Sequence, residues 1–325
     1  MPGRLIPSGP GCPTHGIMFD KMKFKARLNS EDEVERIVTA YRLKYCTEGD
    51  KSFYKSPKEW TFDGINFMIN GNALSVECSI HKVYNKMTRG ALDNSGEFTL
   101  TEGRAALRIL FDAIGVDVSR VTVTYFEIGL NMRMPREAVE YIRLVSSVSE
   151  NRKLFNDANF EENRQKTTEK STNRRKVLKM YDKSFEYRSK GKAVEANILR
   201  LETSYRRQKI PLSDFFNDAF VFRLVSQFSR DWHSLSFPRQ IIAEKGTKGS
   251  QIEKARRIME IGRETYLTES RKDMEAGIIT PKQYRCIREF VQCWDDYRKT
   301  LRFSLHGYGV EFKDEFCRVL HTVSG

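Results

Sequence analysis

The chain has few cysteines, no long apolar run and no recognisable signal peptide. Its six cysteines are scattered and show no CxxC spacing, which argues against a zinc knuckle and against the disulfide framework of a small secreted domain. No stretch approaches the roughly 18 apolar residues of a membrane-spanning helix, and the N-terminal residues lack an apolar core. We therefore expect a soluble cytoplasmic protein without a membrane partner.

Positive charge is abundant and concentrated in one part of the chain. The 325 residues include 56 Lys and Arg against 43 Asp and Glu, a net charge of +13. Residues 151–210 alone hold 17 Lys and Arg and 8 Asp and Glu, a net of +9. A basic excess of this size favours a polyanionic partner such as nucleic acid, without identifying it.

The apolar pattern predicts an α+β fold: a largely antiparallel sheet with helices packed on one face, followed by an all-α C-terminal domain. Residues 1–16 are rich in Pro and Gly, which predicts a flexible N-terminus. Residues 17–210 mix strand and helix patterns, and only helical spacing follows. We therefore place a domain boundary near residue 210, with a helical domain over 211–325.

Two local signals support this interpretation. Asn70-Gly71 separates two β-rich runs, residues 64–69 and 73–84, which predicts a hairpin. Thr99 or Thr101 can cap a helix that Gly115 ends.

Polar side chains collect on one face of four predicted strands. An antiparallel sheet with one solvated face gives such a pattern without any chemistry. A merely solvated face, however, seldom carries His, Tyr and Asn in the middle of its strands, so we favour a functional face. Its members, in chain order, are Glu77 and His81, Glu127 and Asn131, Lys179, Tyr181 and Lys183, and Arg200 and Glu202.

The segment VLKMYDKSFE places Tyr181 between Lys179 and Lys183 on one face of a strand. A tyrosine can act as the nucleophile in phosphodiester transesterification when nearby cations favour its phenolate. We assign Tyr181 as the catalytic nucleophile, with Lys183 to neutralise the phosphate or to assist proton transfer. Tyr84 has a similar local sequence, VYNK, and is the competing candidate.

Glu127, Glu202 and His81 are the predicted metal ligands. Carboxylate oxygens suit Mg²⁺ or Mn²⁺, and a histidine nitrogen is more acceptable to Mn²⁺. The alternative for the two glutamates is a salt bridge with a neighbour such as Arg200, and for His81 it is a hydrogen-bonded strand histidine. The predicted DNA contacts come from the basic block and are Arg174, Arg175, Lys176, Lys179, Arg200, Arg206 and Arg207.

The chain resembles the replication initiators of rolling-circle plasmids and filamentous phages, the plasmid Rep and phage gene II class. The segments that carry the resemblance are SRVTVTYFEIGLN (119–131), KMYDKSFE (179–186) and LRLETSYRR (199–207), in that order. SIHK, followed by Asn85, also looks like a form found in phage-like relatives.

The resemblance implies an HUH-related single-tyrosine endonuclease over about residues 17–210, with its tyrosine at Tyr181, its lysine at Lys183 and its acids at Glu127 and Glu202. Such an enzyme nicks and rejoins single-stranded or hairpin DNA at a replication origin in the cytoplasm of a bacterial host, and a host helicase is a further candidate partner. The chain lacks the His-hydrophobe-His motif and has only Ser79-Ile80-His81. A non-catalytic nucleic-acid-binding protein with the same fold is the alternative.

Overall fold

The structure is a computed structural model. It describes residues 17–57, 64–92, 94, 98–145, 147–148, 152–157, 160, 163–167, 175–194, 196–237, 239–242, 248–300, 302–305 and 307–321. The predicted flexible segment 1–16 lies outside them. The chain forms two compact units, Met1–Ser236 with Val310–Gly325, and Phe237–Gly309.

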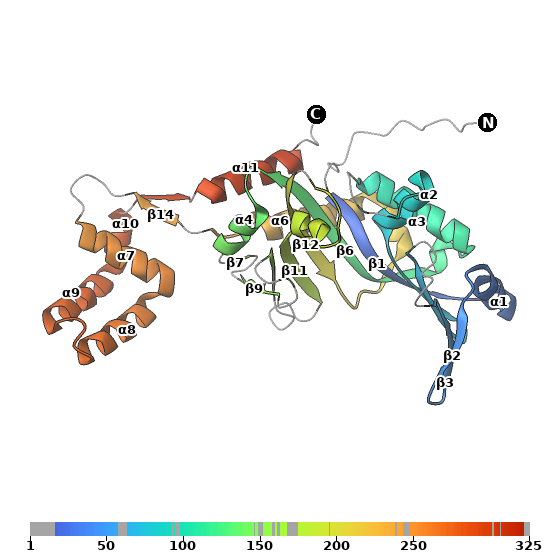
Figure 1. Ribbon diagram of the computed structural model, residues 1–325, viewed down its shortest axis with the longest axis horizontal. Coiled ribbons are helices and arrows are strands. Elements are labelled where there is room, and N and C mark those ends of the chain that lie inside the picture. The colour runs from blue at the N-terminus through green and yellow to red at the C-terminus, as the bar shows by residue number, and fades with distance from the viewer. Residues whose placement is uncertain are drawn as a thin grey trace. The chain divides into compact units, whose positions relative to one another are not determined.

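The first unit is built on one large antiparallel sheet (Figure 1). Its strands follow the order β2-β3-β4-β5-β1-β6-β12-β11-β10-β9, and β13 pairs with β6. The bounds are β1 Ile17–Arg27, β2 Lys44–Glu48, β3 Lys51–Lys55, β4 Asn66–Asn70, β5 Ala73–Ser79, β6 Val121–Met134, β9 Phe155–Asn156, β10 Arg164–Lys166, β11 Lys176–Asp182, β12 Asn197–Tyr205 and β13 Ile210–Pro211. A small pair, β7 Ser147–Val148 and β8 Arg152–Lys153, lies outside this sheet.

Helices pack on one face of the sheet through apolar and aromatic side chains. Phe24 of β1 meets Phe111 with ring centroids 5.0 Å apart, and the indole of Trp232 donates to Thr203 Oγ1 of β12 at 3.1 Å. Both contacts lie on the apolar side of the strands. The helices of this unit are α1 Glu31–Ala40, α2 Ile80–Arg89, α3 Leu100–Ile114, α4 Ala138–Leu144, α5 Lys183–Arg188, α6 Asp218–His233 and, from Val310 onward, α11 Gly307–His321, with a 3₁₀ turn, η3, at Leu212–Phe216.

The second unit contains four helices, α7 Gly249–Ile261, α8 Arg263–Glu275, α9 Pro281–Gln292 and α10 Trp294–Thr300. Ala255, Ile258, Val291 and Trp294 form its core. Thr280 caps α9 in a reciprocal capping box with Gln283, and Pro281 occupies the first turn. A strand pair that the helical spacing did not predict, β14 Arg239–Ile242 with β15 Arg302–Leu305, completes the unit.

The predicted fold class is confirmed: the chain has a large antiparallel sheet with helices and a helical C-terminal region. The predicted hairpin at Asn70-Gly71 joins β4 and β5, and Thr99, rather than Thr101, caps α3. The first unit, however, extends well beyond residue 210. The reason is that α6 is amphipathic and buries its apolar side on the sheet. None of the helices in the described ranges is both long enough and apolar enough to cross a membrane.

Two predicted strands are shorter than expected because a side chain at the end of each caps a helix. The Ser79 hydroxyl accepts from the Lys82 amide, so α2 begins at Ile80. The Asp182 carboxylate accepts from the Phe185 amide, so α5 begins at Lys183. Side chains of this type satisfy amide groups that a helix N-terminus leaves open, and they favour helix over strand at that point.

Replacement of Trp232 by Ala is expected to lower the free energy of unfolding of the first unit by about 3–5 kcal/mol, because it empties a fully buried site against the sheet. Phe222→Ala on the same helix is the control: that ring is 53% exposed, and its removal should cost no more than about 0.5 kcal/mol. Urea unfolding followed by circular dichroism measures both. Equal losses would contradict the packing of α6 on the sheet.

Candidate functional site

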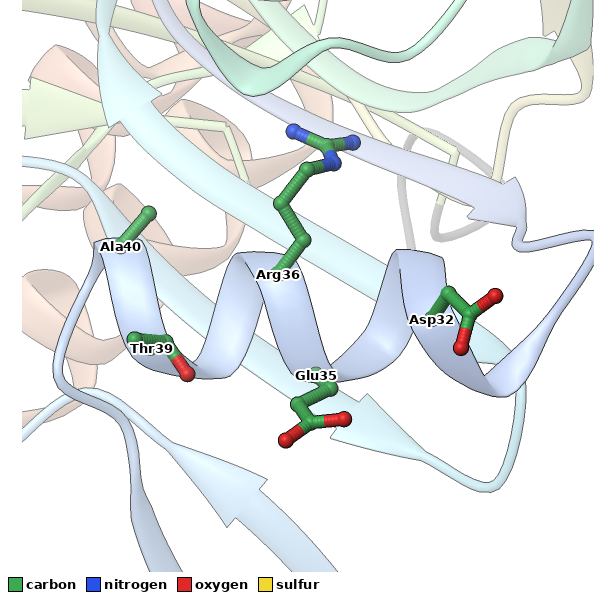
Figure 2. A pocket seen from close by; sticks show the side chains of 5 residues that line it. All are labelled: Asp32, Glu35, Arg36, Thr39 and Ala40. Atoms are coloured by element: carbon green, nitrogen blue, oxygen red, sulfur yellow. The ribbon is translucent and has the colours of Figure 1, made fainter.

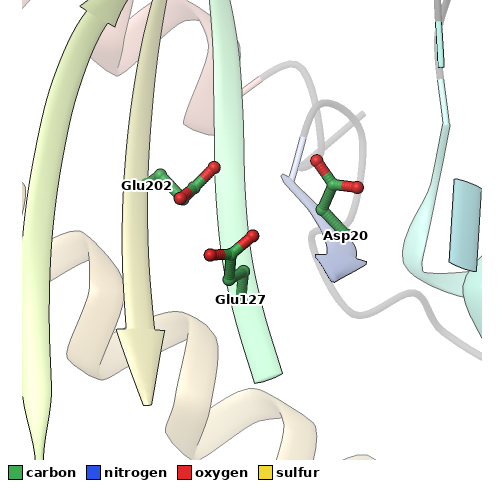
Figure 3. Close-up of side chains that lie close together, drawn as sticks. All are labelled: Asp20, Glu127 and Glu202. Atoms are coloured by element: carbon green, nitrogen blue, oxygen red, sulfur yellow. The ribbon is translucent and has the colours of Figure 1, made fainter. Parts of the chain in front are cut away.

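Three carboxylates converge near the middle of the sheet. Asp20 comes from β1, Glu127 from β6 and Glu202 from β12, which are neighbouring strands (Figure 3). One oxygen from each lies within 4.8 Å of the others, and all three side chains are buried. Oxygen ligands at this spacing form a group that could hold a metal ion.

Asp20 reaches this group because β1 is irregular at this point. Phe19 pairs with Ile128, and the next paired residue is Met22, opposite Phe126, so two residues of β1 stand opposite Glu127 alone. Such a β-bulge turns a side chain out of the regular alternation. Asp20 shares the face of Met18, which also contacts Arg200, and the extra residue of the bulge returns Met22 to the apolar face.

Two cations hold the carboxylates together. Lys179 Nζ donates to Glu127 Oε1 at 2.9 Å and to Glu202 Oε1 at 2.6 Å. Arg200 Nη2 donates to Asp20 Oδ2 at 2.7 Å, and its Nε donates to Glu202 Oε2 at 3.3 Å. Buried charges are stable only when they are paired and hydrogen-bonded, and each of these carboxylates has such a partner.

Gly129 makes room for the guanidinium of Arg200. A Cβ built on Gly129 would lie 2.8 Å from Arg200 Nη2 and 3.0 Å from Cζ. Arg200 is 1% exposed and also donates to Asn131 Oδ1 at 3.2 Å, so it has little freedom to move aside. A glycine at this position of β6 therefore sets the place of the buried cation.

Tyr181 points into the same group. Its hydroxyl donates to Glu202 Oε2 at 3.2 Å, and the Arg164 guanidinium lies 4.6 Å from the centre of its ring. The side chain is 5% exposed, and burial raises the pKa of the Tyr181 phenol well above its usual value. The phenol is therefore protonated in the absence of an added cation.

The two glutamates titrate in opposite directions. Burial, reinforced by the charge of Glu202, raises the pKa of Glu127. Burial also opposes ionisation of Glu202, but Lys179 and Arg200 outweigh it and lower the pKa of Glu202. Glu202 is accordingly the permanently charged member of the pair, and Glu127 is the member that more readily takes up a proton. The Tyr125 hydroxyl and the Ser204 hydroxyl, at 3.2 Å, also donate to Glu127.

The structure joins Tyr181, Glu127 and Glu202 as the sequence predicted, but not His81. His81 lies in the first turn of α2 instead of on a strand, and its ring stacks on Phe98 at 4.3 Å. Asp20 takes the third place in the group of carboxylates. Tyr84, the competing nucleophile, is also on α2 and packs against the same phenylalanine at 5.5 Å.

Lys183 begins α5 and does not share a strand face with Tyr181. Its ammonium lies 5.8 Å from the centre of the Tyr181 ring and pairs with Glu186 at 2.8 Å. Burial lowers the pKa of Lys183. The lysine is thus close to the tyrosine, but it is held by a carboxylate of its own helix.

The predicted DNA contacts separate into two groups. Arg200 is wrong as a DNA contact because it is buried within the carboxylate group, and Lys179 bridges two glutamates there. Lys176 pairs with the buried Asp231. The remaining members are Arg175 and Arg207, which are exposed, Arg206, which is half-buried, and Arg174, which lies outside the described residues.

A shallow cavity of about 490 Å³ lies on the surface of α1 and is lined by Asp32, Glu35, Arg36, Thr39 and Ala40 (Figure 2). The Arg36 guanidinium points away from Glu35 and donates to the Ile114 and Gly115 carbonyls at 2.8 and 3.1 Å. It thereby caps the C-terminus of α3. The cavity contains no group placed for catalysis, so the carboxylate group remains the candidate site.

No protein-family model matches the chain, and no curated protein is similar to it. The resemblance to rolling-circle initiators therefore rests on the residues named above.

Replacement of Glu202 by Gln is expected to lower the free energy of unfolding at pH 7 by about 3–5 kcal/mol, because Lys179 and Arg200 lose a buried partner. Folding lowers the pKa of Glu202. Its contribution is therefore fully present above the ordinary glutamate pKa of about 4.3 and is lost as the pH falls from there through the folded pKa of about 2.

Glu127→Gln is the matched control. Folding raises the pKa of Glu127, so its ionised form becomes unfavourable as the pH rises through that pKa. At pH 7 this variant should be less destabilised than Glu202→Gln, or more stable than the wild type. Urea unfolding in the presence of EDTA at pH 7 and at about pH 3, which lies between the unfolded and folded pKa of Glu202, measures the difference. A larger loss in Glu127→Gln would show that the two charges are assigned the wrong way round.

Proposed function

We propose that the protein is a metal-dependent DNA nicking and joining enzyme that starts rolling-circle replication of a phage or plasmid. One observation carries the proposal: the Tyr181 hydroxyl lies 3.2 Å from a carboxylate oxygen of Glu202, which is one of three carboxylates converging from adjacent strands. A nucleophile beside a candidate cation site is the arrangement that phosphoryl transfer to a tyrosine requires.

The residues fit a hard divalent cation. Asp20, Glu127 and Glu202 offer only carboxylate oxygens, the ligands that Mg²⁺ and Mn²⁺ prefer. The Lys179 ammonium already lies between Glu127 and Glu202, which indicates that this position favours positive charge. A bound cation would polarise a phosphoryl oxygen and favour the tyrosine phenolate.

In the proposed reaction the hydrogen bond to Glu202 orients the Tyr181 hydroxyl, and its proton leaves to solvent water as the phenolate forms. The phenolate oxygen then attacks the phosphorus, a new O–P bond forms, and the bond from phosphorus to the 3′ oxygen breaks. The leaving 3′ oxygen takes up a proton, and the 5′ phosphate remains on Tyr181. Rejoining reverses these steps, with a 3′ hydroxyl as the nucleophile, so no external energy source is needed.

The proposed substrate is single-stranded or hairpin DNA at a replication origin in a bacterial cytoplasm, and a host helicase is a candidate partner. A non-catalytic DNA-binding protein is the second candidate function. The observation that favours it is the burial of Tyr181, which raises the pKa of the phenol, together with the internal pairing of all three carboxylates. In that case Lys179 and Arg200 would serve only to stabilise the sheet.

The test is incubation of the protein with Mn²⁺ or Mg²⁺ and single-stranded oligonucleotides that carry hairpins from its own replicon. A denaturation-resistant adduct is expected with wild type and with Tyr84→Phe. It should be absent with Tyr181→Phe and lost with Asp20→Asn. Both tyrosine substitutions remove one hydroxyl, which makes them matched controls for each other.

An adduct that disappears only with Tyr84→Phe would move the nucleophile to α2. If wild type forms no adduct but binds the oligonucleotides, the non-catalytic function holds instead.

A further inference from the structure

A row of four cations follows β1 beyond the carboxylate group. Lys21, Lys23, Lys25 and Arg27 occupy every second position, whereas Met22, Phe24 and Ala26 between them are buried. In a strand, alternate side chains share one face. The four cations therefore lie together on the side of β1 that faces away from the apolar core, at intervals of about 7 Å.

This row shares a face with the candidate active site. Lys23 stands opposite Tyr125 of β6, and its ammonium lies 5.8 Å from the centre of that ring. The Tyr125 hydroxyl in turn donates to Glu127. Since residues opposite each other in a ladder share a face, the row leads directly to the carboxylates through Tyr125.

The cations of the row are available to bind phosphate in place of their present carboxylate partner. Lys21 and Lys23 both pair with Glu77, at 2.5 and 2.7 Å, but their side chains are 46% and 43% exposed. Exposed ion pairs of this kind contribute only about 0–1 kcal/mol, so a phosphate can replace the carboxylate at little cost. Lys25 and Arg27 are exposed and have no carboxylate partner among the described residues. The row thus carries a net positive charge.

The same face continues across the neighbouring strands towards the sheet edge. Lys25 stands opposite Ser75, Ser75 opposite Met68, and Met68 opposite Lys55. Met68 and Lys55 are exposed. The face is therefore open beside the row, and it adds a further cation at the β2–β3 hairpin that projects beyond α1 (Figure 1).

We propose that the β1 row is the track along which single-stranded DNA approaches the carboxylate group. Regularly spaced cations on an open face complement the evenly spaced phosphates of an extended strand. The site itself lies within the face of the sheet, where its members are buried, so a strand that lies flat on the face can bring a phosphate to it more readily than a duplex. That the bound strand leads to the carboxylate group rests on the proposed function, whereas the binding of DNA by the row does not.

The β1 row provides DNA contacts that differ from those predicted from the sequence. The sequence pointed to the basic block 151–210, but its central members Lys179 and Arg200 are engaged with carboxylates. The β1 row lies in a short basic segment, IMFDKMKFKAR, which has four cations and one acid. The alternation of the strand places all four cations on one face.

The test measures binding of a fluorescein-labelled 20-nucleotide oligo(dT) by anisotropy between 50 and 300 mM NaCl in EDTA, which prevents metal-dependent chemistry. The row variant is Lys21→Gln, Lys25→Gln, Arg27→Gln. The control variant, Lys272→Gln, Lys282→Gln, Arg285→Gln, removes the same charge from exposed positions of the second unit. For single-stranded DNA, each phosphate contact contributes about 0.7 to the slope of log affinity against log salt concentration. With three cations removed, this slope should become shallower by about 2 in the row variant. Its affinity at 100 mM NaCl should fall about tenfold or more.

The control variant should bind within about twofold of wild type. Equal losses in the two variants, an unchanged row variant, or no binding by wild type would each overturn the inference. Circular dichroism and urea unfolding check that the row variant remains folded, as expected for exposed side chains. Failure of the proposed function gives a different result: no covalent adduct with Mn²⁺, while the row variant still loses oligo(dT) binding.

Discussion

The centre of this protein depends on one buried cation. Arg200 lies in the middle of β12 with almost no exposure, and an arginine cannot shed its charge when it is buried. Its guanidinium must therefore find fixed anions within the sheet. Asp20 and Glu202 supply them, Asn131 accepts a further hydrogen bond, and Gly129 leaves the space.

Two other features of the site follow from this constraint. Three carboxylates beside one arginine would still leave an excess of negative charge, and Lys179 offsets it by bridging Glu127 and Glu202. Even with Lys179, the carboxylates outnumber the cations of this group. Burial and the charge of Glu202 therefore raise the pKa of Glu127. A group of this kind attracts a cation, and it orients the Tyr181 hydroxyl through Glu202. The same contacts would therefore serve either to stabilise the sheet or to support catalysis. Only the reactivity of Tyr181 distinguishes these two roles.

The sequence predicts the central strands well, because alternation of apolar and polar residues is a direct consequence of a sheet with one covered face. For that reason it correctly brought Glu127, Tyr181 and Glu202 to one face. It missed Asp20, because a bulge breaks the alternation at that residue. The sequence IMFDKMKF shows the interruption, because Asp20 stands where the pattern of Met22 and Phe24 calls for an apolar residue. The face to which Asp20 points, however, depends on the pairing of β1 with β6. His81 and Lys183 were misplaced because Ser79 and Asp182 end the strands by capping helices, a local contact that competes with the strand pattern.

The central claim is that Tyr181 is the nucleophile of a metal-dependent transesterification. The most direct measurement is tryptic peptide mapping by mass spectrometry of the protein after reaction with origin DNA and Mn²⁺, followed by nuclease trimming. If Tyr181 is the nucleophile, a nucleotide is expected on the peptide Met180–Lys183. A nucleotide on Val83–Lys86, which contains Tyr84, or protein that remains unmodified while its DNA is cut, would contradict it.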